Sequence, residues 1–70
     1  MRISVNGELT ELNGLDGEPP RLDRVLVDLG YKDRKVAVAV NETFVPRTSW
    51  AERTIGTGDR LDVVAPIQGG

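Results

Sequence analysis

Only one stretch longer than a single turn has the apolar spacing of an α-helix, and this limits the folds that the chain can adopt. Its apolar residues recur at positions i, i+3, i+4 and i+7: Leu22, Val25, Leu26 and Leu29. We predict a helix from about Arg21 to Leu29, ended by Gly30 as a C-terminal cap. Because an amphipathic helix buries its apolar stripe against another element, the rest of the chain has to supply a sheet.

The first twelve residues have the pattern of a β-hairpin. Asn6 and Gly7 tolerate the positive φ of a two-residue type I′ turn, so we place the turn at these two residues. In this register Ile3 faces Thr10 on the buried side, while Leu9 falls on the outer side. The hairpin therefore offers one apolar face to the helix.

Three later segments have the pattern of strands. Residues 35–41 are rich in β-branched side chains, with valines on one face and alanines on the other. Phe44 and Val45 predict a short strand that Pro46 stops, and residues 60–65 predict the last strand. Between them, the capping-box spacing of Ser49 and Glu52 predicts one short helical turn over residues 49–52. Hairpin, helix and strands in this order predict a single α+β roll.

Composition excludes several classes of function. The chain has 9 Lys and Arg against 11 Asp and Glu, which argues against nucleic-acid binding, because such binding depends on clustered Lys and Arg. It has no His and no Cys, so the commonest acid–base groups and thiol nucleophiles are missing and an independent enzyme is disfavoured. The dispersed Asp and Glu predict no metal site. The longest clear apolar run, Val36 to Val40, is too short to span a bilayer, and no secretory signal is recognisable, so we expect a cytoplasmic protein.

Five stretches of the sequence, in order, resemble the ThiS family, the sulfur carriers of thiamine (thiazole) biosynthesis within the ubiquitin-like β-grasp proteins. They are I-S-V-N-G-E at residues 3–8, V-A-V-A-V-N at 36–41, V-P-R-T-S-W-A at 45–51, G-D-R-L-D-V-V at 58–64 and the terminal G-G. V-P-R-x-x-W-A and G-G are the more specific of these. The resemblance implies a β-grasp roll in which a mixed sheet of four to five strands packs on one main helix, with the last strand placed centrally beside the first.

The same resemblance implies how the C-terminal end acts. A β-grasp domain at residues 1–65 would precede a flexible tail at 66–70, and Gly70 would be the site of adenylation and of the thiocarboxylate. The tail residues for insertion into a partner would be Ile67, Gln68 and Gly69. The domain itself would bind no cofactor, and ATP would be used by a ThiF-like adenylating enzyme. A cysteine desulfurase would be the sulfur source, and a ThiG-like thiazole synthase would take the sulfur.

The residues are compatible with this chemistry. An α-carboxyl group is ionised at neutral pH and can act as a nucleophile, but it acylates poorly until it is activated. Gly70 has no Cβ to hinder attack on its carbonyl carbon, and Gly69 permits a close approach of the backbone to a partner. The apolar Ile67 fits either a contact with the domain edge or an anchor in a partner. Trp50 is interpreted as a filler of the core or of its edge.

Two other functions share parts of this pattern. The small subunit of molybdopterin synthase also ends in G-G and uses a thiocarboxylate, although V-P-R-T-S-W-A favours the thiamine branch. A ubiquitin-like modifier would share the adenylation step but would end in an isopeptide bond with a lysine. Conjugates in cell extracts would support the modifier, whereas a free thiocarboxylate would support a sulfur carrier.

Overall fold

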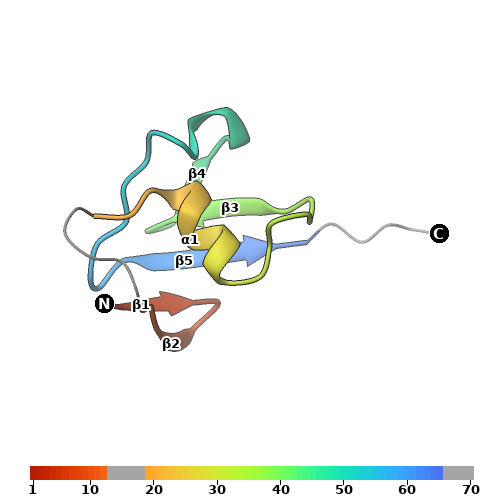
Figure 1. Ribbon diagram of the computed structural model, residues 1–70. Coiled ribbons are helices and arrows are strands. Elements are labelled where there is room, and N and C mark those ends of the chain that lie inside the picture. The colour runs from red at the N-terminus through yellow and green to blue at the C-terminus, as the bar shows by residue number, and fades with distance from the viewer. Residues whose placement is uncertain (13–18, 66–70) are drawn as a thin grey trace.

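The computed structural model of the chain describes residues 1–12 and 19–65, which form a sheet with a helix packed on one side (Figure 1). In chain order the elements are β1 (Arg2–Val5), β2 (Glu8–Glu11), α1 (Leu22–Asp28), β3 (Ala37–Val40), β4 (Thr43–Val45), a 3₁₀ helix (Arg47–Ser49) and β5 (Arg60–Val64). The strands are ordered β2-β1-β5-β3-β4. The last strand, β5, is central, parallel to β1 and antiparallel to β3, which confirms the predicted mixed sheet.

The N-terminal hairpin has the predicted register. Ile3 pairs with Thr10 across β1 and β2, and the turn residues Asn6 and Gly7 have φ values of 51° and 85°. Such positive φ values are those of a type I′ turn, whose twist matches that of the two strands. Leu9 lies on the outer side and is 81% exposed, as the alternation predicted.

Helix α1 is one residue shorter at each end than the predicted helix, because Arg21 and Leu29 are its cap residues. Gly30 ends the helix with a φ of 94°, a conformation that glycine adopts without steric cost. The N–H of Gly30 donates to the carbonyl of Val27 at 3.1 Å, and that of Tyr31 donates to the carbonyl of Leu26 at 2.9 Å. This pair of bonds is a Schellman motif, which satisfies two of the carbonyls that the helix end leaves unpaired.

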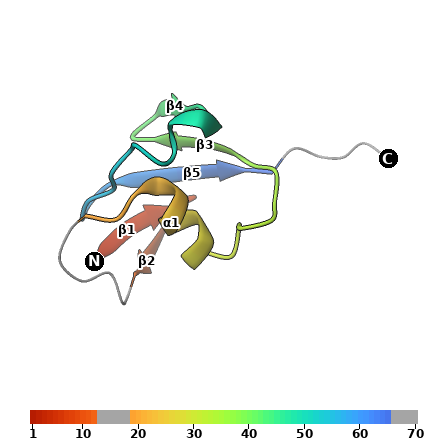
Figure 2. The same ribbon diagram turned by 45° about the horizontal axis from the view of Figure 1, so that its top comes forward.

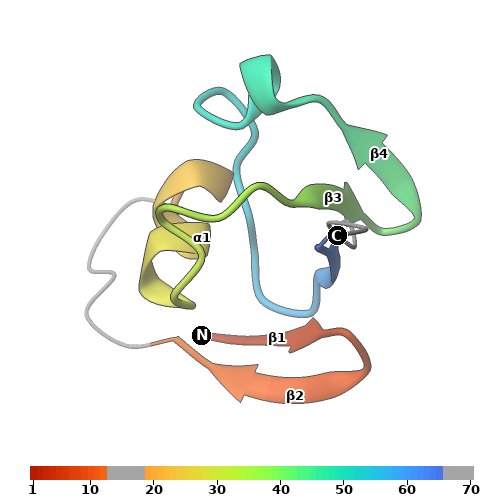
Figure 3. The same ribbon diagram turned by 90° about the vertical axis from the view of Figure 1, so that its right-hand side faces the viewer.

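The core lies between α1 and the concave side of the sheet, which curves around the helix (Figures 2 and 3). Its buried residues are Ile3, Leu12, Leu22, Val25, Leu26, Val38, Val40, Val45, Ile55, Leu61 and Val63. Most of the helix stripe and of the inward residues of the strands are therefore buried together, as the sequence predicted, whereas Leu29 and Val5 are partly buried and Ala65 is exposed. Ile55 was not predicted, because it follows a turn-rich segment with no strand or helix periodicity.

Several other predicted boundaries differ from the structure by one or two residues. The helical turn predicted over residues 49–52 is present, since the carbonyl of Ser49 accepts the N–H groups of Glu52 at 3.0 Å and of Arg53 at 3.1 Å. The helical segment nevertheless begins earlier, with the 3₁₀ helix Arg47–Ser49, whose N-cap is Pro46 with no side-chain cap bond. Pro46 has a φ of −60°, and its carbonyl accepts the N–H of Ser49 at 2.8 Å, so the turn starts directly after the proline that ends β4. Strand β3 begins at Ala37, two residues later than predicted, and ends one residue earlier, at Val40. Strand β4 begins one residue earlier than predicted, and β5 ends one residue earlier.

Candidate functional site

The residues predicted to carry the chemistry lie outside the described residues: Ile67, Gln68, Gly69 and Gly70. The structure does describe the strand that leads to them, since β5 ends at Val64 and Ala65 follows it. As the central strand, β5 is paired with β1 on one side and with β3 on the other. The chain therefore continues into residues 66–70 from the middle of the sheet, where a strand is held most firmly.

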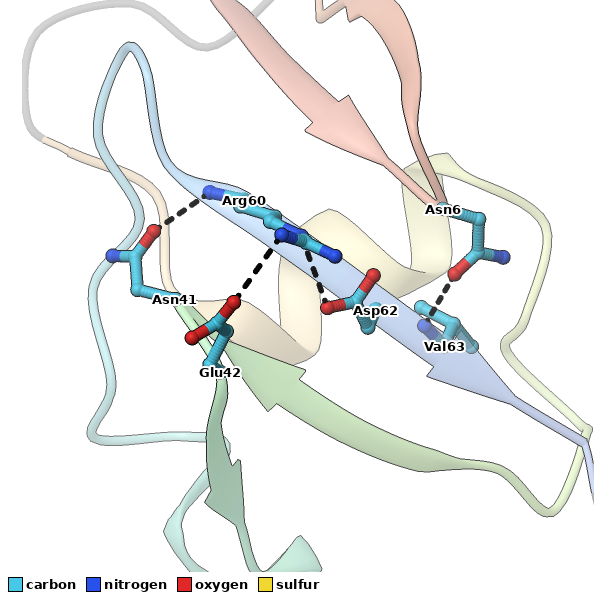
Figure 4. Close-up of polar contacts among 6 residues, drawn as sticks. All are labelled: Asn6, Asn41, Glu42, Arg60, Asp62 and Val63. Atoms are coloured by element: carbon cyan, nitrogen blue, oxygen red, sulfur yellow. Dashed lines mark hydrogen bonds and ion pairs between the residues drawn. The ribbon is translucent and has the colours of Figure 1, made fainter.

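Both ends of β5 are also held by asparagine side chains from hairpin turns (Figure 4). The Oδ1 atom of Asn41, in the turn between β3 and β4, accepts the backbone N–H of Arg60 at 2.9 Å. The Oδ1 atom of Asn6, in the turn between β1 and β2, accepts the backbone N–H of Val63 at 2.7 Å. These bonds fix the strand from its first residue almost to its last.

The side of the sheet that faces away from α1 carries a small apolar patch, formed by Ala37, Ala39, Phe44 and Val64. Phe44 is 63% and Val64 is 61% exposed. The four residues lie side by side on three neighbouring strands. Ala39 of β3 pairs with Phe44 of β4, and Ala37 of β3 pairs with Val64 of β5. Exposed aromatic and branched side chains that cluster in this way are typical of a protein-binding surface. Val64 also ends β5, so the apolar patch adjoins the start of the C-terminal segment.

Figure 4 shows a charged group on the open face of the sheet, formed by Glu42, Arg60 and Asp62. The guanidinium of Arg60 pairs with the carboxylate of Glu42 at 3.4 Å and with that of Asp62 at 3.3 Å. Asp62 lies opposite Ala39 in the sheet, next to the apolar patch. Because these ion pairs are exposed, we expect them to add little stability, but they give the open face a charged rim that a partner can recognise.

Trp50 belongs to the opposite layer of the molecule and has a structural role, as predicted. Its ring is partly buried against the core, and its Nε1–H donates to the carbonyl of Val45 at 3.0 Å. The guanidinium of Arg47 lies over the ring, 6.0 Å from its centroid, at a cation–π distance. Trp50 thus ties the segment after β4 to the end of that strand.

Within residues 1–12 and 19–65, no group of three or more His, Cys, Asp or Glu side chains is arranged to hold a metal ion. In the same part of the chain, no helix has the length and apolar character needed to cross a membrane. The features that stand out in this part are therefore the apolar patch, its charged rim and the firmly held end of β5.

One helix packed on a five-stranded mixed sheet, with the last strand in the centre, defines a ubiquitin-like β-grasp protein. The sequence model of the ThiS family matches residues 3–70, nearly the whole chain. The chain belongs to the ThiS family, whose members are small sulfur carrier proteins of thiamine biosynthesis.

Solved structures show the same fold. The crystal structure of the thiamine biosynthesis protein ThiS from Geobacter metallireducens matches with a TM-score of 0.81 and 24% identity, over 100% of both chains. The solution structure of a thiamine biosynthesis protein from the same organism matches with a TM-score of 0.79 and 24% identity, over 100% of this chain and 88% of that one.

A curated relative is a much longer protein. The thiazole synthase of Paramagnetospirillum magneticum is 36% identical over 70 residues, which is 100% of this chain and 20% of the relative. The chain therefore spans a fifth of the length of the curated relative that it matches.

Proposed function

We propose that this chain carries sulfur as a thiocarboxylate on Gly70 and delivers it to a thiazole synthase during thiamine biosynthesis. The observation that carries the proposal is the match to the ThiS family, which extends through residue 70 of a β-grasp domain. The firmly held central strand supports it, because β5 leads directly into the segment that ends in Gly69-Gly70. The chain would act as a co-substrate of its partner enzymes and would not itself be an enzyme.

The chemistry begins at the terminal carboxylate. A carboxylate oxygen of Gly70 attacks the α-phosphorus of ATP on a ThiF-like activating enzyme, and pyrophosphate leaves. The terminal sulfur of a persulfide, formed with a cysteine desulfurase, then attacks the acyl carbon and displaces AMP. A thiol reduces the resulting acyl disulfide, which releases the thiocarboxylate. The glycine at this position leaves the acyl carbon open to each attack because it has no side chain.

Thiazole synthase is the proposed acceptor of the sulfur. The protein from Paramagnetospirillum magneticum that bears this name contains a segment similar to this whole chain within a polypeptide about five times as long. Two functions that occur in one polypeptide commonly act in consecutive steps. This relative therefore supports the thiamine branch over a role in molybdopterin synthesis.

The activating enzyme is the proposed partner of the apolar patch. The apolar patch includes Val64, which ends β5, so a protein docked on Phe44 and Val64 would also meet the start of the C-terminal segment. Five extended residues reach about 17 Å at most, so the reaction centre of the enzyme has to lie within that distance of the docked face. Docking on the apolar patch and insertion of residues 66–70 would thus be parts of one interaction.

The test is the intact mass of the purified protein after incubation with the activating enzyme, ATP and a persulfide source. We expect a gain equal to the replacement of one oxygen by sulfur, mapped to Gly70 by fragmentation, and no gain when ATP is omitted. The mass of the untreated protein would first establish that the chain ends at Gly70. No gain with an enzyme that loads a known carrier would refute the proposal, and lysine-linked conjugates in cell extracts would favour a protein modifier.

A further inference from the structure

The side-chain bond from Asn6 to β5 replaces a bond that the backbone cannot make. Along the parallel pair of β1 and β5, the N–H of Ser4 donates to the carbonyl of Asp59 at 3.0 Å, and that of Asn6 donates to the carbonyl of Leu61 at 2.8 Å. The next bond of this ladder would run from the N–H of Val63 to the backbone carbonyl of Asn6. The positive φ of Asn6 turns the chain into the hairpin, and the side-chain Oδ1 accepts this N–H at 2.7 Å instead.

Without the Asn6 side chain, the end of β5 would be held from one side only. Strands β1 and β5 pair at two positions only, Ser4 with Arg60 and Val5 with Leu61. Register between β3 and β5 extends farther, to Ala37 with Val64. The Asn6 bond therefore extends the attachment on the β1 side by two residues, to Val63. Figure 4 shows the Asn6 side chain directed at β5.

We propose that Asn6 is a positioning residue for the C-terminal segment. It holds β5 in place up to the point where the chain leaves the domain, so that the residues after Ala65 are presented from a fixed origin. This role rests on the function proposed above, because it concerns the presentation of Gly70 to the activating enzyme. A fixed origin lowers the entropy that the segment loses on insertion, and this lowers the KM for the carrier.

Two substitutions at residue 6 separate the hydrogen bond from the turn. Asn6→Gly keeps the positive φ but removes the acceptor, whereas Asn6→Asp keeps both an acceptor oxygen and tolerance of positive φ. Asn41 supplies a matched control. The φ of Asn41 is 50°, and its side-chain Oδ1 accepts a backbone N–H of β5 in place of the backbone carbonyl of Asn41. That N–H belongs to Arg60, the first residue of β5. Asn41→Gly thus removes a comparable bond at the far end of the same strand, together with the bond that the Nδ2–H of Asn41 donates to the Oδ1 of Asp59 at 3.2 Å.

The assay is ATP–pyrophosphate exchange by the activating enzyme with the carrier as the varied substrate, well below the melting temperature of every variant. We expect Asn6→Gly to raise the KM for the carrier by about three- to tenfold, the factor that one net hydrogen bond represents, with kcat little changed. Asn6→Asp and Asn41→Gly should keep the KM of the parent. Hydrogen exchange at the Val63 amide should accelerate in Asn6→Gly alone.

The outcomes separate this role from the proposed function. If the parent supports no exchange, the function proposed above fails and the role of Asn6 fails with it. If the parent is active and Asn6→Gly has the KM of Asn41→Gly, only the positioning role is overturned. The role is also overturned if Asn6→Asp is as impaired as Asn6→Gly, because the acceptor oxygen would then not be the cause.

Discussion

Replacement of Phe44 tests whether the apolar patch binds the activating enzyme. The substitution is Phe44→Thr, which removes the ring but keeps a residue that favours strands. Phe44 lies on the edge strand β4 and is 63% exposed. We therefore expect the free energy of unfolding to change by about 0.5 kcal/mol or less.

The expected loss of affinity follows from the area that the ring has left to bury. A phenylalanine can bury about 150–250 Å² in total. With 63% of the residue exposed, roughly 100–150 Å² remains to be covered by a partner, of which threonine would restore about a third. At about 25 cal/mol per Å², the lost burial amounts to about 1.7–2.5 kcal/mol. Allowing for incomplete burial, we expect Kd to rise by about 5- to 30-fold.

The assay is calorimetric titration of the carrier with the activating enzyme, and Val27→Thr is the matched control. Val27 is also an exposed apolar residue, 45% exposed, but it lies on α1, in the other layer of the molecule. Its substitution should leave Kd unchanged. An unchanged Kd for Phe44→Thr, or an equal rise for both variants, would refute the assignment of the open face to this partner.

Three further predictions concern the core, the Trp50 contact and the terminus. Leu26 is 3% exposed, so Leu26→Ala should lower the free energy of unfolding by about 2–5 kcal/mol through the cavity that it leaves; an unchanged urea midpoint would contradict its place in the core. Trp50→Phe removes the donor to the carbonyl of Val45 and should cost about 1 kcal/mol in the same measurement, whereas parental stability would mean that the bond adds nothing. Deletion of Gly70 should abolish adenylation in the exchange assay while the thermal midpoint stays at the parental value, and full activity of that variant, which would end in the carboxylate of Gly69, would argue against Gly70 as the required site.

Local periodicity predicted much of the fold because the spacing of apolar residues along a helix or strand reflects which of its faces is buried. The stripe of α1 and the alternation along β1 each reproduce the observed burial, and Asn6-Gly7 set the register of the first hairpin correctly. The helical turn predicted over residues 49–52 is present, but the helical segment begins two residues earlier than predicted, because it starts directly after Pro46. Of the residues in the candidate site, the sequence pattern indicated only part of the apolar patch. These were the alanines on the outward face of the strand observed as β3.

Patterns within short stretches of the chain specified the helix stripe, the hairpin turn and the faces of the strands, because each of these depends on residues close together in sequence. Tertiary structure alone decided which strands meet. It brought Val64 next to Ala37, and it placed the side chain of Asn6 against Val63, 57 positions along the chain. It also buried Ile55, which has no local pattern. These contacts form only when the sheet closes around α1, since their partners are distant in sequence and no short-range spacing encodes them.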